Sequence, residues 1–234
     1  MGQAVGPNAL KMLRRYDVGR SARRSWRFAP QRIATVRRIP GAVMNGIMLL
    51  ALAMSPPITA EPQLSRIPQV LRGAYEQIGA TQVYDGTYRP IAFPGGDVPI
   101  ERGVCTDVIV RAYRQAGIDL QLLVNQDMSR AFRSYPSLWG LSRPDPNIDH
   151  RRVPNLANFL KRHSQGLKVS TRSEDYRSGD IVTWRLPSGA PHIGLISDRR
   201  HGGRPLVVHN IGAGVQVEDV LFSYEITGHY RYDP

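Results

Sequence analysis

Three residues of this sequence have side chains that could together carry out nucleophilic chemistry. Cys105 is the one cysteine of the chain, His192 opens a short apolar segment, and His209 ends the next such segment. A thiolate is a strong nucleophile, and an imidazole within hydrogen-bond reach can take the thiol proton. If the two segments are adjacent antiparallel strands, one histidine can act as the base and the other can orient it. The pattern therefore favours a Cys-His-His site.

Each of these residues also has an ordinary structural interpretation. A lone cysteine on an apolar helix is often a small core residue, and two histidines on strands can be satisfied structural side chains. One cysteine and two histidines could also supply three zinc ligands, although no closely spaced ligand pair supports a metal site. A single cysteine excludes an intramolecular disulfide framework and a cysteine-rich metal centre. We expect neither a metal nor a cofactor.

The elements that must position these residues follow from the hydrophobic periodicity. Cys105 lies in the first turn of a predicted helix, where the positive end of the helix dipole favours a thiolate and should lower the thiol pKa. After residue 166 the pattern changes to short β-branched and aromatic segments separated by turns. Helices followed by an antiparallel sheet indicate an α+β fold. The predicted helices cover 64–79, 104–116, 120–132 and 155–161, and the predicted strands cover 180–184, 192–197, 206–209 and 226–232.

The segments between these elements give weaker indications. Residues 135–154 contain four prolines, which predicts an ordered loop or no fixed structure. Glu218, Asp219 and Phe222 are expected in a short turn or helix, with no chemical role.

Basic residues are concentrated at the N-terminus and not in the domain. Residues 1–40 hold ten Lys and Arg residues against one acid, for a charge of +9, whereas residues 61–234 carry only +3. A net charge of only +3 does not provide the clustered basic surface that binding of a phosphate backbone needs, so we expect no nucleic-acid partner for the domain. The basic arm is followed by an apolar segment, 42–54, and then by a cleavage region of small residues that ends at Ala60. This is the order of a secretory signal.

The chain is therefore divided into a targeting segment, 1–60, and one exported domain, 61–234, that we expect to be monomeric. At 234 residues and 41% hydrophobic composition, the chain has room for one such domain with a real core. An uncleaved membrane anchor and a nucleic-acid-binding tail are the alternative interpretations of the N-terminal segment.

At the cysteine and the histidines the sequence resembles the NlpC/P60 cysteine peptidase superfamily. More closely, residues 66–234 resemble the bacterial family DUF1287. The resemblance implies a papain-like α+β fold, with a nucleophile-bearing helix packed on a small curved antiparallel sheet. It further implies Cys105 as the nucleophile, His192 as its base and His209 as the orienting group. The segments that carry the resemblance are 103–114, 144–156, 179–184, 192–196, 208–209 and 228–232.

The resemblance also implies an activity, and the signal-like order of residues 1–60 gives the expected location. A thiol hydrolase of the bacterial periplasm or cell envelope, cleaving an amide or peptide bond in cell-wall peptides, is the expected function. A thiol acyltransferase or a non-catalytic envelope binding module on the same fold are the alternatives. The sequence departs from NlpC/P60 enzymes at Thr106-Asp107, where those enzymes usually carry Ser-Gly. Their tyrosine upstream of the cysteine has no clear counterpart, and Tyr88 is the nearest candidate.

A polar segment, residues 145–152, is the candidate for substrate recognition. Arg151 or Arg152 could hold a substrate carboxylate, because arginine binds carboxylates with two parallel hydrogen bonds. The alternative is a loop whose polar side chains bond to its own backbone. Trp184 is interpreted as a wall of the core or of the cleft. The full set of candidate substrate-binding residues is Asp107, Asp149, His150, Arg151, Arg152 and Trp184.

Overall fold

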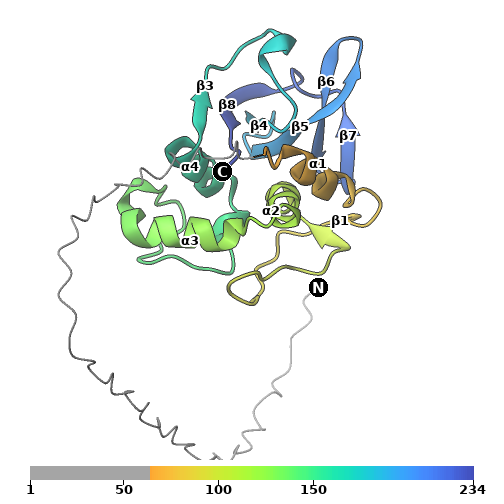
Figure 1. The fold of residues 1–234 in the computed structure, drawn as a ribbon. Helices are drawn as coiled ribbons and strands as arrows, with labels where there is room; N and C mark the ends of the chain where they lie inside the picture. Colours follow the sequence, from red (N-terminus) through yellow and green to blue (C-terminus); the bar gives the residue numbers. More distant parts are fainter. Residues whose placement is uncertain (1–63) are drawn as a thin grey trace, which may run out of the picture. The chain divides into compact units, whose positions relative to one another are not determined.

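The computed structural model describes residues 64–234, so the predicted signal at residues 1–60 lies outside the described residues. Four α-helices precede a six-stranded antiparallel sheet, which confirms the α+β prediction (Figure 1). The helices are α1 (Ile67–Tyr75), α2 (Cys105–Gln115), α3 (Leu120–Ala131) and α4 (Val153–His163), with the 3₁₀ turns η1 (Phe132–Ser134), η2 (Asp149–Arg151) and η3 (Ser173–Asp175).

The main sheet has the strand order β3-β8-β4-β5-β6-β7, and every neighbouring pair in it is antiparallel. Strands β4 to β7 follow one another in sequence, and β8 returns to pair with β4. A separate pair of two-residue strands, β1 and β2, precedes α2 and is parallel. The strands are β1 (Val83–Tyr84), β2 (Arg102–Gly103), β3 (Gln165–Leu167), β4 (Ile181–Arg185), β5 (Pro191–His201), β6 (Arg204–Asn210), β7 (Val215–Glu218) and β8 (Glu225–Arg231).

The two faces of the main sheet bury different side chains. Side chains alternate along a strand, so Ile193 and Leu195 of β5 pack in the same core cluster as α2, whereas Ile196 belongs to a second cluster with Trp184 and Val207. The wide apolar stripe of α2, which includes Val108, Ile109, Ala112 and Tyr113, is fully covered. The helix therefore holds its N-terminal residue, Cys105, against the sheet.

Several elements differ from the sequence-based expectations. Strands β1, β2 and β3 were not predicted, and Glu218 ends strand β7 instead of lying in a turn or short helix. β7 has only four residues, and its pairing with β6 makes it a strand. Helix α4 begins at Val153, two residues before the predicted start, because Pro154 is tolerated in a first helical turn that needs no proline N–H. The segment 135–152 is an ordered loop.

Candidate active site

Cys105 is fixed at the first position of α2 by its neighbours in sequence. The backbone N–H of Val104 donates to Asp107 Oδ2 (2.7 Å), which satisfies the residue that caps the helix. The absence of a side chain at Gly103 leaves room for this arrangement, because a Cβ atom would lie 3.1 Å from both Asp107 Oδ2 and Arg111 Nη1 and would press against them. The Gly103 carbonyl accepts a hydrogen bond from Asn210 Nδ2 (3.1 Å), which ties the end of β6 to the start of α2.

The thiol of Cys105 is buried, with only 3% of the residue exposed. Burial raises the thiol pKa to about 11, although the backbone N–H groups of Ile193 and Thr106 and the side chain of Tyr84 act in the opposite direction. The expectation of a lowered pKa was therefore wrong for the resting site. Loss of hydration outweighs one helix terminus, which contributes only about 0.3–2 kcal/mol.

Tyr84, in β1, is the tyrosine beside the cysteine, and Tyr88 is not. Burial and the neighbouring Cys105 side chain raise the Tyr84 pKa, so its hydroxyl is protonated and can donate to the sulfur. The hydroxyl of Tyr88 instead accepts a hydrogen bond from Asn147 Nδ2 (3.0 Å). The sequence did not single out Tyr84, because only the parallel pairing of β1 with β2 brings it next to residue 105.

The two candidate histidines contact each other. His192 Nε2 lies 2.9 Å from His209 Nδ1, and the two rings are both buried. His209 Nε2 lies 2.9 Å from Glu218 Oε2. Strand pairing explains this series of hydrogen bonds. Glu218 of β7 lies opposite Val207 of β6, and Val207 and His209 are two residues apart on the same strand, so their side chains share a face of the sheet. Glu218 and His209 therefore project from the same face. Glu218 was missed from the sequence because β7 was not expected.

This chain of hydrogen bonds fixes the tautomers of both histidines. An ionised carboxylate only accepts, so His209 must carry its proton on Nε2 and accept at Nδ1. His192 then donates from Nε2, and its Nδ1 keeps a free lone pair. Burial, and the charge of His209, lower the pKa of His192 to about 3, and burial also lowers the pKa of His209 despite the carboxylate of Glu218. The site therefore rests with neutral imidazoles and an acceptor nitrogen on His192.

The start of β5 brings the residue after His192 to the sulfur. The Ile193 N–H interacts with the Cys105 sulfur, and His192 directly precedes it in the strand. Within residues 64–234 no hydrogen bond joins the thiol to His192. Apo active sites often have such loose contacts, which tighten when substrate is bound.

Trp184 and Gly194 hold the imidazoles in place. Trp184 pairs with His192 across β4 and β5, its ring centroid lies 5.8 Å from the imidazole, and its Nε1–H donates to the Leu221 carbonyl (2.9 Å). Trp184 is 1% exposed, so it is a core residue behind the base and not a substrate contact. A Cβ on Gly194 would lie 3.2 Å from His209 Cβ and 2.6 Å from Val207 Cγ1, so the glycine makes room for the second histidine.

Most of the polar segment 145–152 is structural. Arg151 binds Asp107 through two hydrogen bonds, Nε to Oδ1 (2.8 Å) and Nη2 to Oδ2 (2.9 Å), and both residues are buried. Asp149 accepts from the Asp145 backbone N–H (2.6 Å) and from Arg152 Nη1 (3.0 Å). The proposed substrate roles of Asp107 and Arg151 are therefore wrong: their charges bind each other across 44 residues of sequence and are not free for a ligand.

His150 is also buried, and burial lowers its pKa to about 4. It lies in η2, which contacts α2, α3 and α4, so His150 is part of the helical core and does not have the expected substrate contact.

Arg152 differs from the other candidates, because its guanidinium lies over the Trp139 ring, 4.0 Å from the ring centroid. It lines a cavity of about 320 Å³ together with Tyr88 and with Val104, the residue before the cysteine. Arg151 lines the same cavity but is held by Asp107, whereas Arg152, although paired with Asp149, has the more exposed guanidinium and is the better placed of the two to meet a substrate.

Comparison with known families matches residues 71–232 to a domain of unknown function, DUF1287. The chain belongs to the DUF1287 family. It is 52% identical over 178 residues to the uncharacterized protein YijF of Escherichia coli K12, across 76% of this chain and 87% of that protein.

Among solved structures, the DUF1287 chain is similar to a Staphylococcus aureus protein described as similar to lipoprotein, of the NLP/P60 family. The match has a TM-score of 0.36 and 14% sequence identity, and it covers 70% of this chain and 42% of that one. Similarity at this level bears on neither substrate nor mechanism, which must come from the side chains.

In residues 64–234, no three or more His, Cys, Asp or Glu side chains gather as a metal site. None of the described helices is long and apolar enough to cross a membrane.

Proposed function

We propose that this DUF1287 protein is a thiol hydrolase that cleaves an amide bond through an acyl-enzyme. One observation carries the proposal: the hydrogen-bonded chain Glu218–His209–His192 leaves an unprotonated nitrogen on His192, the residue before the Ile193 N–H that contacts the Cys105 sulfur at a helix N-terminus. A structural cysteine needs no base, and a buried pair of histidines needs no carboxylate to set its tautomer. The arrangement matches the requirements of a nucleophile, its base and two orienting groups.

In the proposed reaction, Cys105 Sγ attacks the amide carbonyl carbon while the thiol proton moves to His192 Nδ1. Because the thiol and imidazole both rest neutral, proton transfer accompanies attack and no thiolate needs to form beforehand. The backbone N–H of Cys105, free at the helix terminus, donates to the oxyanion. Collapse breaks the C–N bond as His192 protonates the leaving amine. Water then hydrolyses the thioester, with His192 as base, and the thiol is restored.

We further propose that the substrate is a cell-wall peptide and that the protein acts in the cell envelope. The support is the order of a basic arm, an apolar segment and a small-residue exit within residues 1–60, together with the resemblance to NlpC/P60 enzymes. N-terminal sequencing of protein from the envelope fraction should begin after Ala60. Full-length protein recovered from the cytoplasm would contradict this location.

The decisive experiment compares wild type with Cys105→Ser and Cys105→Ala on isolated cell-wall fragments, with products identified by mass spectrometry. Serine is nearly isosteric with cysteine, so both variants should melt within a few degrees of wild type. Its hydroxyl is far less acidic than a thiol, so cleavage should fall by at least about 10³-fold. Incorporation of ¹⁸O from labelled water into the new carboxylate identifies hydrolysis. Full activity of Cys105→Ser would show that Cys105 is a core residue.

A further inference from the structure

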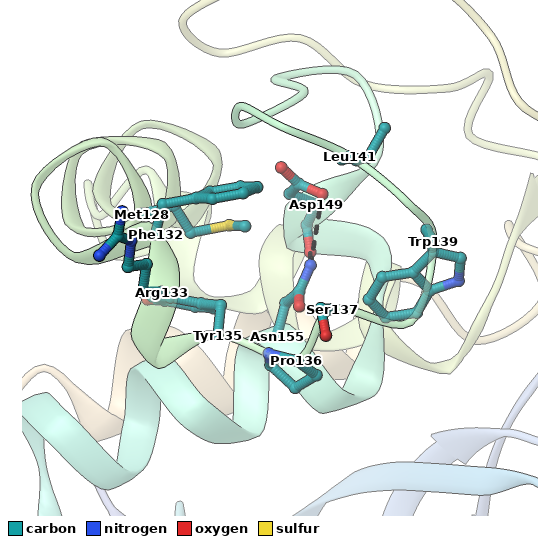
Figure 2. A pocket seen from close by; sticks show the side chains of 10 residues that line it. All are labelled: Met128, Phe132, Arg133, Tyr135, Pro136, Ser137, Trp139, Leu141, Asp149 and Asn155. Atoms are coloured by element: carbon teal, nitrogen blue, oxygen red, sulfur yellow. Dashed lines mark hydrogen bonds between the residues drawn. The ribbon is translucent and has the colours of Figure 1, made fainter.

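A second cavity lies beside the proposed cleft and has walls of a different chemistry. It has a volume of about 260 Å³ and lies between the end of α3, the loop 135–141, η2 and α4 (Figure 2). Figure 2 shows Phe132 and Tyr135 on one side, Trp139 on the other, and Asp149 with Asn155 between them. Its apolar lining is completed by Met128, Pro136 and Leu141.

The polar wall of this cavity presents acceptors. Asp149 and Asn155 are each 1% exposed, and the Asn155 amide nitrogen is directed at Asp149 Oδ1 (3.3 Å). The carbonyl oxygen of the same side chain is buried, and among residues 64–234 it has no hydrogen-bond partner. A buried acceptor without a donor is unfavourable, because it has lost its hydrogen bonds to water and gained none in the protein. A ligand that places a hydrogen-bond donor in the cavity would supply the partner that this oxygen lacks.

The charge of this wall selects the kind of donor. Asp149 is buried, and although Arg152 pairs with it, burial still raises its pKa above the usual value for an aspartate. A positive charge in the cavity would stabilise this carboxylate. Aromatic faces also attract cations, and three aromatic rings line the space. Arg133 is at the exposed rim, so the interior offers acceptors and rings to a cation.

Trp139 connects this cavity to the cleft beside the nucleophile. The indole lines both spaces, and Arg152, which stacks on it, lines the space that also contains Val104. A peptide with its reacting carbonyl at Cys105 would pass this tryptophan on one side of the site. We propose that the cavity is a subsite for an ammonium group on an apolar stem, carried by the substrate. This inference rests on the proposed function for its role in catalysis, but not for binding itself.

Binding is measured on the Cys105→Ala protein by NMR titration with n-pentylamine, n-pentanol and pentanoate, three probes that share an apolar stem. We expect n-pentylamine to bind at least 10-fold more tightly than n-pentanol, and pentanoate not to bind. Asp149→Asn should remove this preference for the amine. Because Asp149 also holds its own loop, that variant could lose its fold, and a second pair of variants avoids the problem.

Ser137 and Leu138 are both exposed loop residues, but only Ser137 lines the cavity. Ser137→Trp should fill the cavity and abolish amine binding, whereas the matched control Leu138→Trp should bind normally, with both melting as the parent does. Equal affinity for amine and alcohol, or unchanged binding to Ser137→Trp, would overturn the subsite.

A second measurement separates this inference from the proposed function. In the active protein, Ser137→Trp should raise KM at least 10-fold for peptides that carry a free amine, with little change for the same peptides after acetylation. An equal effect on both peptides would overturn the subsite while hydrolysis stands. Amine binding by a protein that hydrolyses nothing would refute the proposed function and leave the binding site intact.

Discussion

Burial decides the protonation state of the two groups that the proposed reaction needs most. The Cys105 thiol pKa is raised to about 11 and the His192 pKa is lowered to about 3, so a thiolate–imidazolium pair is not the resting state. Loss of hydration penalises both charged forms, and the pair has no close compensating charge. Reactivity then depends on a substrate that brings the sulfur to His192 Nδ1.

The resting thiol should therefore behave as an ordinary buried cysteine. Thiolate absorbance near 240 nm should be absent at pH 8 and appear only as the pH approaches 11, and alkylation by iodoacetamide should follow the same curve. Denatured protein, titrating near the ordinary cysteine value, is the control. A thiolate already present at pH 6–7 would mean that the site rests as an ion pair.

Glu218 is expected to act through the tautomer of His192. In Glu218→Gln the amide can donate to His209 Nε2, which reverses the hydrogen-bond chain and leaves His192 Nδ1 protonated. Activity should fall about 10- to 100-fold in kcat/KM, as is usual for groups that orient a ligand or base. The exposed acid Glu225, on β8, gives the matched control Glu225→Gln. Equal activity in the two variants would remove Glu218 from the site.

The two histidines should differ in the size of their effects. His192→Ala removes the base and should approach the loss seen without the nucleophile, whereas His209→Asn should retain measurable activity, with a loss near 10²-fold. Asn210 cannot replace His209, because its side chain already holds the Gly103 carbonyl and the Gly212 N–H. Equal and complete losses, with unchanged melting, would contradict this division of roles.

At the scale of elements, the site depends on how closely β5 and β6 approach each other. Gly194 leaves the space into which His209 and Val207 pack, and any side chain there must displace one of them. The Asp107–Arg151 pair similarly fixes the start of α2 to η2. The candidate active site is thus a junction of a helix terminus and two strands, braced by a buried ion pair.

Gly194→Ala should move the second histidine. Overpacking of this size typically costs about 1–3 kcal/mol, so the free energy of unfolding should drop by that amount and kcat/KM should fall as His209 leaves His192. Gly166 in β3, where a Cβ meets nothing within 4 Å, provides the control Gly166→Ala. Chemical denaturation and activity assays measure both effects. If Gly194→Ala behaves like Gly166→Ala, the close packing at this point has no importance.

For the whole molecule, the buried histidines predict sensitivity to acid. His150 and His192 have pKa values of about 4 and about 3 in the folded state, against about 6.5 when unfolded. Below pH 6.5 the unfolded chain binds protons that the folded one does not, so stability is lost as the pH falls. Each histidine contributes up to about 1.4 kcal/mol per pH unit.

Urea denaturation at pH 7, 6 and 5 should show this loss. The slope of the unfolding free energy against pH gives the number of protons taken up on unfolding. In His150→Gln this number should be smaller by up to one proton, whatever the stability of the variant at pH 7. The exposed His201→Gln should leave the slope unchanged. A slope that is identical in all three proteins would show that His150 is charged in the folded state.

The sequence alone determined the four helices and the four strands β4, β5, β6 and β8, and the placement of Cys105, His192 and His209 on them. Those features are local: periodicity of 3.6 or 2, glycines at turns and a cysteine at a helix start are encoded within some ten residues. That local pattern also made the contact between His192 and His209 foreseeable, since adjacent short strands usually pair.

Tertiary structure alone decided the rest, because it depends on register and burial between distant segments. Pairing of β7 with β6 recruits Glu218, pairing of β1 with β2 brings Tyr84 to the thiol, and folding of η2 onto α2 joins Arg151 to Asp107. The direction of the Cys105 pKa shift was misjudged for the same reason: helix position is visible in sequence, whereas loss of water depends on everything packed around the sulfur.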